Sequence, residues 1–275
     1  MKHPKLLKTA AAATALLSVT YLYSLKGRSC HPGLEDLKGW GYAHRGLHKE
    51  GIPENSRAAF RAALEKGYGI ELDIHLMKDG NLAVIHDASL LRTAGVDVQI
   101  EDLTAEDLEN YRLEGTDEKI PLFKDVMALY EGKAPMIVEL KPVNNNHAAL
   151  AEAACDLLAE YQGIYCIESF DPRCLQWLKK NRPHIIRGQL TENFVAHDQK
   201  LNPAIRFVLT HNLLNFTTVP DFVAYKFADR KDTISNPLCR WAWDIQGVTW
   251  TIRTQEDYDT AVQEGWLPIF EGFEP

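Results

Sequence analysis

Short apolar runs alternate with amphipathic segments from residue 40 to the end of the chain. This alternation constrains the fold more than any other feature, because strands that alternate with helices form parallel βα units. Nine runs have the composition of strands: Trp40–His44, Ile70–Ile74, Leu82–His86, Met136–Leu140, Ile164–Ser169, Ile185–Leu190, Phe222–Lys226, Val248–Ile252 and Leu267–Phe270.

The turn between the second and third runs removes one strand from this repeat. The runs are separated by a short segment that contains Asp79-Gly80, a strong signal for a two-residue hairpin turn. Counting back along both arms from that turn places Asp73 opposite His86. The third run is then antiparallel, and the other eight predict an α/β fold: a TIM (β/α)₈ barrel with one extra hairpin strand.

Helix start and stop signals support the segments between the strands. The brackets are Asn55 as a cap for residues 56–66 ending at Gly67, the capping pair Thr104 and Asp107, the cap and first-turn proline Asp171-Pro172, and Thr254 with Gly265. Residues 191–246 are less regular and include the apolar stretch 204–216. We expect a helix packed on the barrel there, or an apolar wall beside the site that touches a lipid-like substrate.

The distribution of charge excludes one class of partner. The chain has 275 residues and a formal charge of −8, but residues 1–30 contain five of the 30 basic groups and no acids. The remaining residues carry 25 basic against 38 acidic groups, a net charge of −13. Such an acidic body argues against nucleic acid as a partner.

The N-terminal segment is expected to associate with a membrane. Lys2, Lys5 and Lys8 precede an uncharged run from Thr9 to Leu25. The run is longer than a usual signal-peptide core, and no convincing cleavage motif follows it. We therefore favour residues 1–30 as a transmembrane signal anchor, with residues 38–275 as an extracytoplasmic catalytic domain; a cleaved signal peptide and a secreted protein is the alternative.

Five polar residues at or near the ends of the strands form the candidate site. Glu71 and Asp73 lie two apart and share one face of a strand, and Glu139 ends another run. An all-oxygen set of this kind suits one Ca²⁺ or Mg²⁺ ion. His44 and His86 titrate near neutral pH, so we expect His44 to act as a base and His86 as an acid, or the reverse.

Further residues are assigned to the surroundings of the site. Arg45 and Lys141 can hold phosphate oxygens, or pair with the neighbouring carboxylates. Possible second-sphere or substrate residues are His75, Glu54, Trp250 and Glu271. His147, His184, His197 and His211 have no partner pattern, and the five cysteines show neither a zinc spacing nor a disulfide framework.

The motifs together resemble the glycerophosphodiester phosphodiesterase family, a relative of the phosphatidylinositol-specific phospholipases C. The matching pieces, in the family's order, are AHRG (43–46), PENS (53–56), ELDIHLMKDG (71–80), IHDASLLRT (85–93), IPLFKDV (120–126), VELK (138–141), SF (169–170) and VTWTIRT (248–254). The family's PENT is PENS here, no motif matches in 191–246, and the ending that contains Glu271 departs from the usual one.

The resemblance implies a hydrolase of lipid and glycerol metabolism that converts glycerophosphodiesters to sn-glycerol 3-phosphate and an alcohol. It implies His44 and His86 as acid–base residues, Glu71, Asp73 and Glu139 as ligands of a divalent cation, and Arg45 and Lys141 as phosphate contacts. Two other functions stay open: a lysophospholipase D acting on acylated lipids, and an inactive barrel that serves as a membrane-tethered binding module. The nucleophile is water or a neighbouring substrate hydroxyl, and the oligomeric state is left open.

Overall fold

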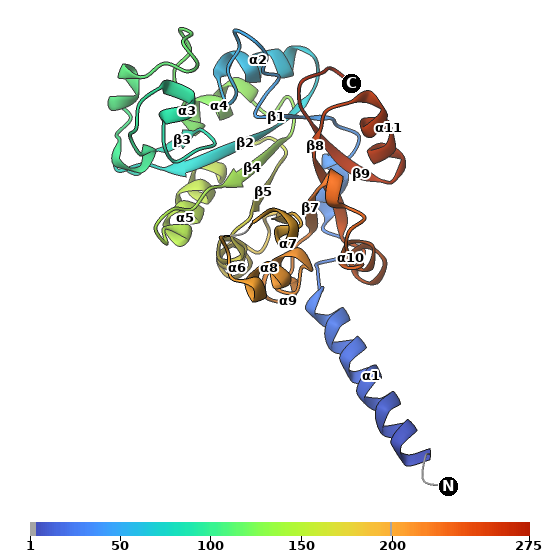
Figure 1. Cartoon of the computed structure of the whole chain (residues 1–275). Helices are drawn as coiled ribbons and strands as arrows, with labels where there is room; N and C mark the ends of the chain where they lie inside the picture. Colours follow the sequence, from blue (N-terminus) through green and yellow to red (C-terminus); the bar gives the residue numbers. More distant parts are fainter. Residues whose placement is uncertain (1–3, 199) are drawn as a thin grey trace.

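Nine strands form one sheet, and eight of them close into a parallel barrel (Figure 1). The computed structural model describes residues 4–198 and 200–275, without the side chains of 4–8 and 10, so Lys2 and the side chains of Lys5 and Lys8 lie outside it. Strand β1 pairs with both β2 and β9, which closes the ring. The strands are β1 (Tyr42–His44), β2 (Gly69–Leu76), β3 (Leu82–Val84), β4 (Met136–Leu140), β5 (Tyr165–Ser169), β6 (Arg187–Thr191), β7 (Phe222–Lys226), β8 (Gln246–Ile252) and β9 (Trp266–Phe270). The predicted barrel and all nine strands are confirmed.

The hairpin is antiparallel as predicted, but the predicted register is wrong by one residue. Ile74 lies opposite Val84, so Asp73 faces Ile85 and not His86. The reason is the turn: it has three residues, 78–80, between Met77 and Asn81, and Gly80 takes a left-handed φ of +85°. A three-residue hairpin loop with a left-handed final residue shifts the pairing by one position from that of a two-residue loop.

Helices surround the barrel, and their ends agree with the predicted capping residues with two corrections. The helix α2 is capped by the side chain of Ser56, not Asn55, and the Thr104–Asp107 pair precedes a short 3₁₀ turn instead of an α-helix. Asp171 and Thr254 cap their helices as expected. The α-helices beyond the N-terminal one are α2 (Arg57–Glu65), α3 (Leu91–Ala94), α4 (Phe123–Tyr130), α5 (His147–Leu158), α6 (Pro172–Asn181), α7 (Phe194–His197), α8 (Pro203–Thr210), α9 (Asn215–Thr218), α10 (Ser235–Trp243) and α11 (Gln255–Gln263). The 3₁₀ turns are η1 (Pro32–Leu37), η2 (Ile100–Asp102), η3 (Asp107–Asn110) and η4 (Phe227–Asp229).

Apolar side chains fill the barrel interior towards the N-terminal ends of the strands, and the polar residues lie at the C-terminal ends. Leu34 and Leu37 of η1 pack with inward-facing residues of several strands, among them Ile137, Phe222 and Val248. A separate apolar cluster lies beneath the hairpin and the loops that follow it, so this insertion has a core of its own.

The N-terminal helix α1 (Pro4–Ser24) projects away from the barrel (Figure 1). Within residues 4–198 and 200–275, no helix combines the length and hydropathy needed to cross a membrane, so the predicted transmembrane segment is not supported. Leu25 is buried, and Arg28 forms two 2.6 Å contacts with the fully buried Asp221. The backbone of Arg28 also donates to Pro220, so α1 meets the barrel where β7 begins.

The less regular region contains short helices around β7. Helices α7, α8 and α9 lie between β6 and β7, and α10 follows β7. Helix α8 keeps Ile205 and Phe207 about half exposed, at 50% and 53%. The expected helix in this region is therefore present, with part of its apolar surface facing solvent.

Candidate functional site

His44, Glu71, His86 and Glu139 line one cavity at the C-terminal ends of the barrel strands, and Asp73 lies beside Glu71 and Glu139. His44 ends β1, and Glu71 and Glu139 belong to β2 and β4, while His86 follows β3. Parallel strands of a barrel end at one face, which is why residues far apart in sequence converge there. The cavity is lined by His44, Arg45, Glu71, His86, Glu139, Glu168, Phe170, Leu190, Trp250 and Ile269.

Three buried carboxylates form the centre of the site. Glu71, Asp73 and Glu139 are 2%, 1% and 6% exposed, and one oxygen from each lies within 4.8 Å of the others. The Oδ1 atom of Asp73 is buried and makes no hydrogen bond to any residue that the structure describes. Three oxygen donors at this separation fit a hard divalent cation, because Ca²⁺ holds carboxylate oxygens at about 2.3–2.6 Å and Mg²⁺ at about 2.0–2.1 Å.

Two basic residues contact the same carboxylates. Nζ of Lys141 lies 3.0 Å from Glu139 and 3.6 Å from Asp73. Nε of Arg45 lies 3.5 Å from Asp73, and its backbone N–H donates to Glu71. Arg45 and Gly46 both have a left-handed φ, +54° and +81°, so the chain turns sharply after β1 and brings Arg45 over the site. Gly46 is required there, because a Cβ would lie 2.8 Å from that of Ala59.

The pKa values of the carboxylates diverge although the three are equally buried. Burial, followed by the charge of Asp73, raises the pKa of Glu71 well above its usual range. Burial also raises the pKa of Glu139, to about 7. Burial acts on Asp73 too, but Lys141, His86 and Arg45 outweigh it and lower the pKa of that residue. Asp73 is thus the carboxylate that stays ionised most readily.

Glu271 holds His44 in place. Its Oε2 atom lies 2.5 Å from Nδ1 of His44, and its other oxygen pairs with Arg253 at 3.1 Å. Burial would raise the pKa of Glu271, but the contact with His44 outweighs it and lowers the pKa to about 2. Since Nδ1 is engaged, Nε2 is the nitrogen of His44 left for proton transfer, and it lies 3.8 Å from Glu71.

His86 has an equivalent partner in its neighbour Asp87. Nδ1 of His86 lies 2.6 Å from Asp87, and Asp87 in turn accepts from Arg92. Arg92 also donates to Glu54, and Glu54 accepts a further hydrogen bond from Arg45 at 3.0 Å. Glu54 therefore belongs to a charged network beside the cavity and does not line it. Burial lowers the pKa of both His44 and His86 below the usual value for histidine.

His75 and Trp250 occupy different places. The His75 ring is buried outside the cavity, 2.7 Å from Glu101 and 3.2 Å from the carbonyl oxygen of His86, so it supports the segment that carries His86. Trp250 lines the cavity, and its ring meets that of Phe170 edge-on at 5.6 Å. These aromatic rings form an apolar wall opposite the charged groups.

The chain is similar to known proteins in both sequence and fold. Residues 44–270 match the sequence profile of the glycerophosphoryl diester phosphodiesterase family. The chain belongs to this family. A glycerophosphodiester phosphodiesterase of Caldanaerobacter subterraneus is 34% identical over 158 residues, which are 54% of this chain and 65% of that protein. A lysophospholipase D of Rattus norvegicus is 36% identical over 133 residues, which are 44% of this chain and 41% of that protein.

The fold is shared with solved structures. A phosphodiesterase of Oleispira antarctica, solved in complex with the product sn-glycerol-3-phosphate, matches with a TM-score of 0.70. The sequences are 20% identical, and the match covers 89% of this chain and 95% of that one. This likeness shows the barrel fold. In sequence, the chain spans less than two thirds of the length of either curated relative described above.

Sequence reasoning missed three residues around this glycerophosphodiesterase-type site. Asn55, expected as a helix cap, has a left-handed φ of +53° and donates to Asp73 at 2.9 Å. Asp87 is the partner of His86, and its position beside a candidate catalytic histidine was the available signal. Glu168 is a fourth buried carboxylate in the cavity, and a charged residue inside the apolar strand YCIES could have revealed it.

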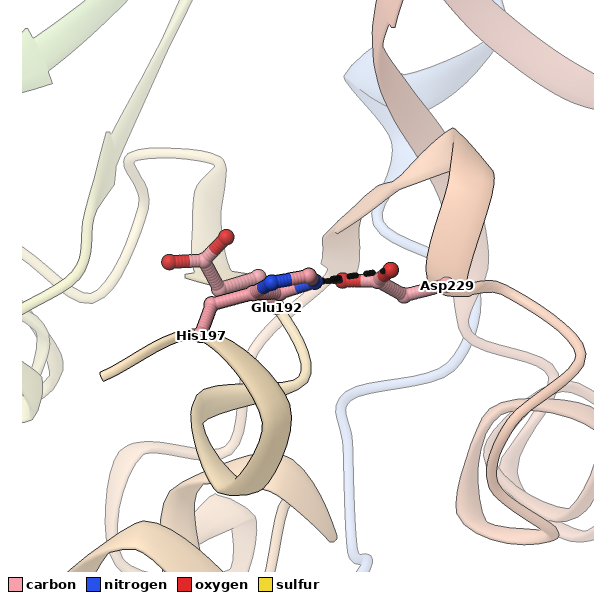
Figure 2. Close-up of side chains that lie close together, drawn as sticks. All are labelled: Glu192, His197 and Asp229. Atoms are coloured by element: carbon pink, nitrogen blue, oxygen red, sulfur yellow. Dashed lines mark hydrogen bonds and ion pairs between the residues drawn. The ribbon is translucent and has the colours of Figure 1, made fainter. Parts of the chain in front are cut away.

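A second group of possible ligands lies apart from the site. Glu192, His197 and Asp229 offer atoms within 4.8 Å of one another (Figure 2). The His197 ring contacts Asp229 at 3.0 Å, and Glu192 pairs with Lys226 at 2.9 Å. Ion pairs within the protein already account for this group, so we describe it as a structural network that joins the ends of β6 and β7.

Proposed function

We propose that this chain is a metal-dependent phosphoric diester hydrolase that cleaves glycerophosphodiesters to sn-glycerol 3-phosphate and an alcohol. One observation carries the proposal: two histidines, each bonded through Nδ1 to a carboxylate, line the cavity that contains the three-carboxylate site. A diester hydrolase needs a proton acceptor, a proton donor and a charge-stabilising centre, and the cavity offers all three. Membership of the family supports the same reaction.

Glu71, Asp73 and Glu139 would hold a divalent cation, which when bound neutralises charge on a phosphate oxygen. Arg45 and Lys141 lie beside these carboxylates and would bind the other phosphate oxygens as they bind carboxylate oxygens in this structure. Asn55 orients Asp73 through its 2.9 Å hydrogen bond. These residues would hold the phosphate between the cation ligands and the two histidines.

The histidines would move the protons. His44, whose Nδ1 is engaged by Glu271, would accept a proton at Nε2 from water or from a substrate hydroxyl. His86 would donate a proton to the departing alkoxide, so that an alcohol leaves instead of a strong base. Glu271 and Asp87 stabilise the protonated state of each ring. After the step, His44 carries an extra proton and His86 lacks one, so exchange with solvent would return both rings to their starting states.

The direct test is a substrate panel with the purified full chain in Ca²⁺, Mg²⁺, Mn²⁺ or chelator. We expect sn-glycerol 3-phosphate from glycerophosphocholine or a relative in the presence of a cation, and near-complete loss in His44→Ala and Glu71→Ala. Normal turnover by either variant would overturn the assignment of the site. Absence of turnover with every cation would favour the binding-module alternative, and ¹⁸O-labelled water with a search for a cyclic phosphate would identify the nucleophile.

A lysophospholipase D activity is the second candidate, and one surface favours it. Ile205 and Phe207 of α8, with Val195 of α7, present exposed apolar side chains on the β6–β7 side of the barrel. Helix α1 argues against this activity. The segment that follows α1 meets the barrel where β7 begins, which is the end opposite the cavity. We therefore expect deacylated diesters to react faster than lysolipids; a clear preference for lysolipids, lost in Phe207→Ser, would establish the second candidate.

A further inference from the structure

Glu168 continues a row of carboxylates across three neighbouring strands. Asp73 of β2 pairs in register with Glu139 of β4, and Glu139 pairs in register with Glu168 of β5. Register partners on adjacent parallel strands point to the same face and lie roughly 4.8 Å apart. The three side chains therefore project into the barrel side by side, and Glu168 lines the same cavity as His44 and His86.

The carboxylate of Glu168 has no protein partner that explains its burial. It is 1% exposed, and its Oε2 atom makes no hydrogen bond within the described part of the chain. On its β6 side the register partner is Gly188, where the ring of Phe222 fills the space that a side chain would take. An apolar ring offers neither charge nor hydrogen bonds, so the charges that act on Glu168 come from Glu139, Asp73 and Lys141.

When all four carboxylates of the cavity are ionised, the local charges do not balance without a cation, whereas in its absence burial favours protonation of Glu71, Glu139 and Glu168. Glu71, Asp73, Glu139 and Glu168 carry four formal negative charges when ionised. The described Lys and Arg side chains in ion pairs with them are Arg45 and Lys141, which leaves a net charge of −2. A buried charge without compensation is strongly unfavourable, and one divalent cation restores neutrality.

We propose that Glu168, which lies next to the three carboxylates whose oxygens are within 4.8 Å of one another but is not one of them, is a fourth carboxylate of the cation site and biases this site toward Ca²⁺ over Mg²⁺. Ca²⁺ accepts six to eight oxygen ligands in flexible geometry, whereas Mg²⁺ keeps several waters and takes one or two carboxylates. A fourth carboxylate beside three others therefore adds more to Ca²⁺ binding. The inference rests on the proposed function for the role of the cation, but it concerns a residue outside the set of Glu71, Asp73 and Glu139.

The test is direct cation binding to the full chain and its Glu168→Gln variant by isothermal titration calorimetry. We expect Ca²⁺ affinity to fall roughly 10- to 100-fold, the range seen when groups that support a metal site are removed. Mg²⁺ affinity should fall less, so the ratio of the two affinities decreases. At pH values high enough to ionise Glu168, the cation-free variant should also unfold at a higher temperature than the wild type, because an unpaired buried charge is gone, whereas loss of a merely structural residue would lower that temperature.

The control is Glu264→Gln, which removes a carboxylate that is paired with Arg230 and belongs to neither group of possible ligands. It should leave both affinities unchanged; an equal loss in both variants, or unchanged Ca²⁺ binding in Glu168→Gln, would overturn the inference. Glu168→Met, similar in volume and uncharged, decides the question if the Gln variant does not fold. Binding is measured without turnover, so a failure of the proposed reaction and a failure of this assignment are separate results.

Discussion

The Nδ1 atom of His44 lies 2.5 Å from Oε2 of Glu271, so the residue that ends the first barrel strand is held by the residue that follows the last strand. Glu271→Gln keeps the shape of this side chain and removes its charge. We expect kcat/KM to fall about 10²-fold or more, the range for general acid–base groups. Arg253→Gln, which affects only the other oxygen of Glu271, is the control and should have a small effect.

The pH profile of the Glu271→Gln variant should identify the role of His44. Glu271 raises the pKa of His44, so its removal lowers that pKa. If His44 must be deprotonated to act, the acidic limb of kcat/KM moves to lower pH, which is our expectation. A shift of the alkaline limb to lower pH would instead make His44 the acid, and profiles with neither limb moved would contradict the contact.

Asp87→Asn is the corresponding experiment on His86. Asp87 raises the pKa of His86 through a 2.6 Å contact, so the variant should lower it. With His86 as the acid, we expect the alkaline limb to move to lower pH while the acidic limb stays. Measuring both variants at one saturating cation concentration assigns the two roles independently.

Removal of the cation should affect both activity and stability. Chelator should abolish turnover, and Ca²⁺ or Mg²⁺ should restore it. A ligand that binds only the folded chain stabilises it by about 2.7 kcal/mol at 100 times its Kd. The melting temperature should therefore rise with cation concentration in the wild type and stay constant in Glu71→Ala; an equal rise in both would place the stabilising ion elsewhere.

Arg28→Ala should destabilise the barrel although Arg28 precedes its first strand. The change leaves the fully buried Asp221 without the guanidinium of Arg28, although the backbone N–H of Arg187 still donates to it. Removal of one member of a fully buried pair costs about 3–5 kcal/mol, and because Arg28 is 25% exposed we expect the loss to lie at or below the lower end of that range. Denaturant unfolding would measure the loss. Lys38→Ala, which breaks an exposed pair with Glu35, is the control and should change stability by less than about 1 kcal/mol.

Hydrophobic periodicity was sufficient to predict the barrel, because each buried strand is an apolar run between helix signals. It was not sufficient for the hairpin, where the left-handed backbone of Gly80 adds a loop residue that no periodicity reveals. His86 nevertheless reaches the cavity, since it follows the paired residues and is held by Asp87 and His75. Asn55 was misplaced for a related reason: its left-handed backbone turns the side chain from the helix end toward Asp73.

The predicted site residues came from strand ends, whereas the roles of Glu168 and Glu271 depend on contacts between strands. Glu168 acquires meaning only beside Glu139, which requires the pairing of β4 with β5. The 2.5 Å contact of Glu271 with His44 likewise requires β9 to lie beside β1. Such relationships depend on sheet order and register, which a single sequence specifies only indirectly.

The pairing of β1 with β9 also ties the chemistry to a late event in folding. Until these strands meet, His44 and Glu271 are separated by nearly the whole length of the chain, and loop closure over such a distance is entropically unfavourable. A half-formed barrel can carry all of its carboxylates and still have an unoriented histidine. Recovery of catalysis during refolding would therefore serve as a clock for ring closure, lagging behind any signal from the helices alone.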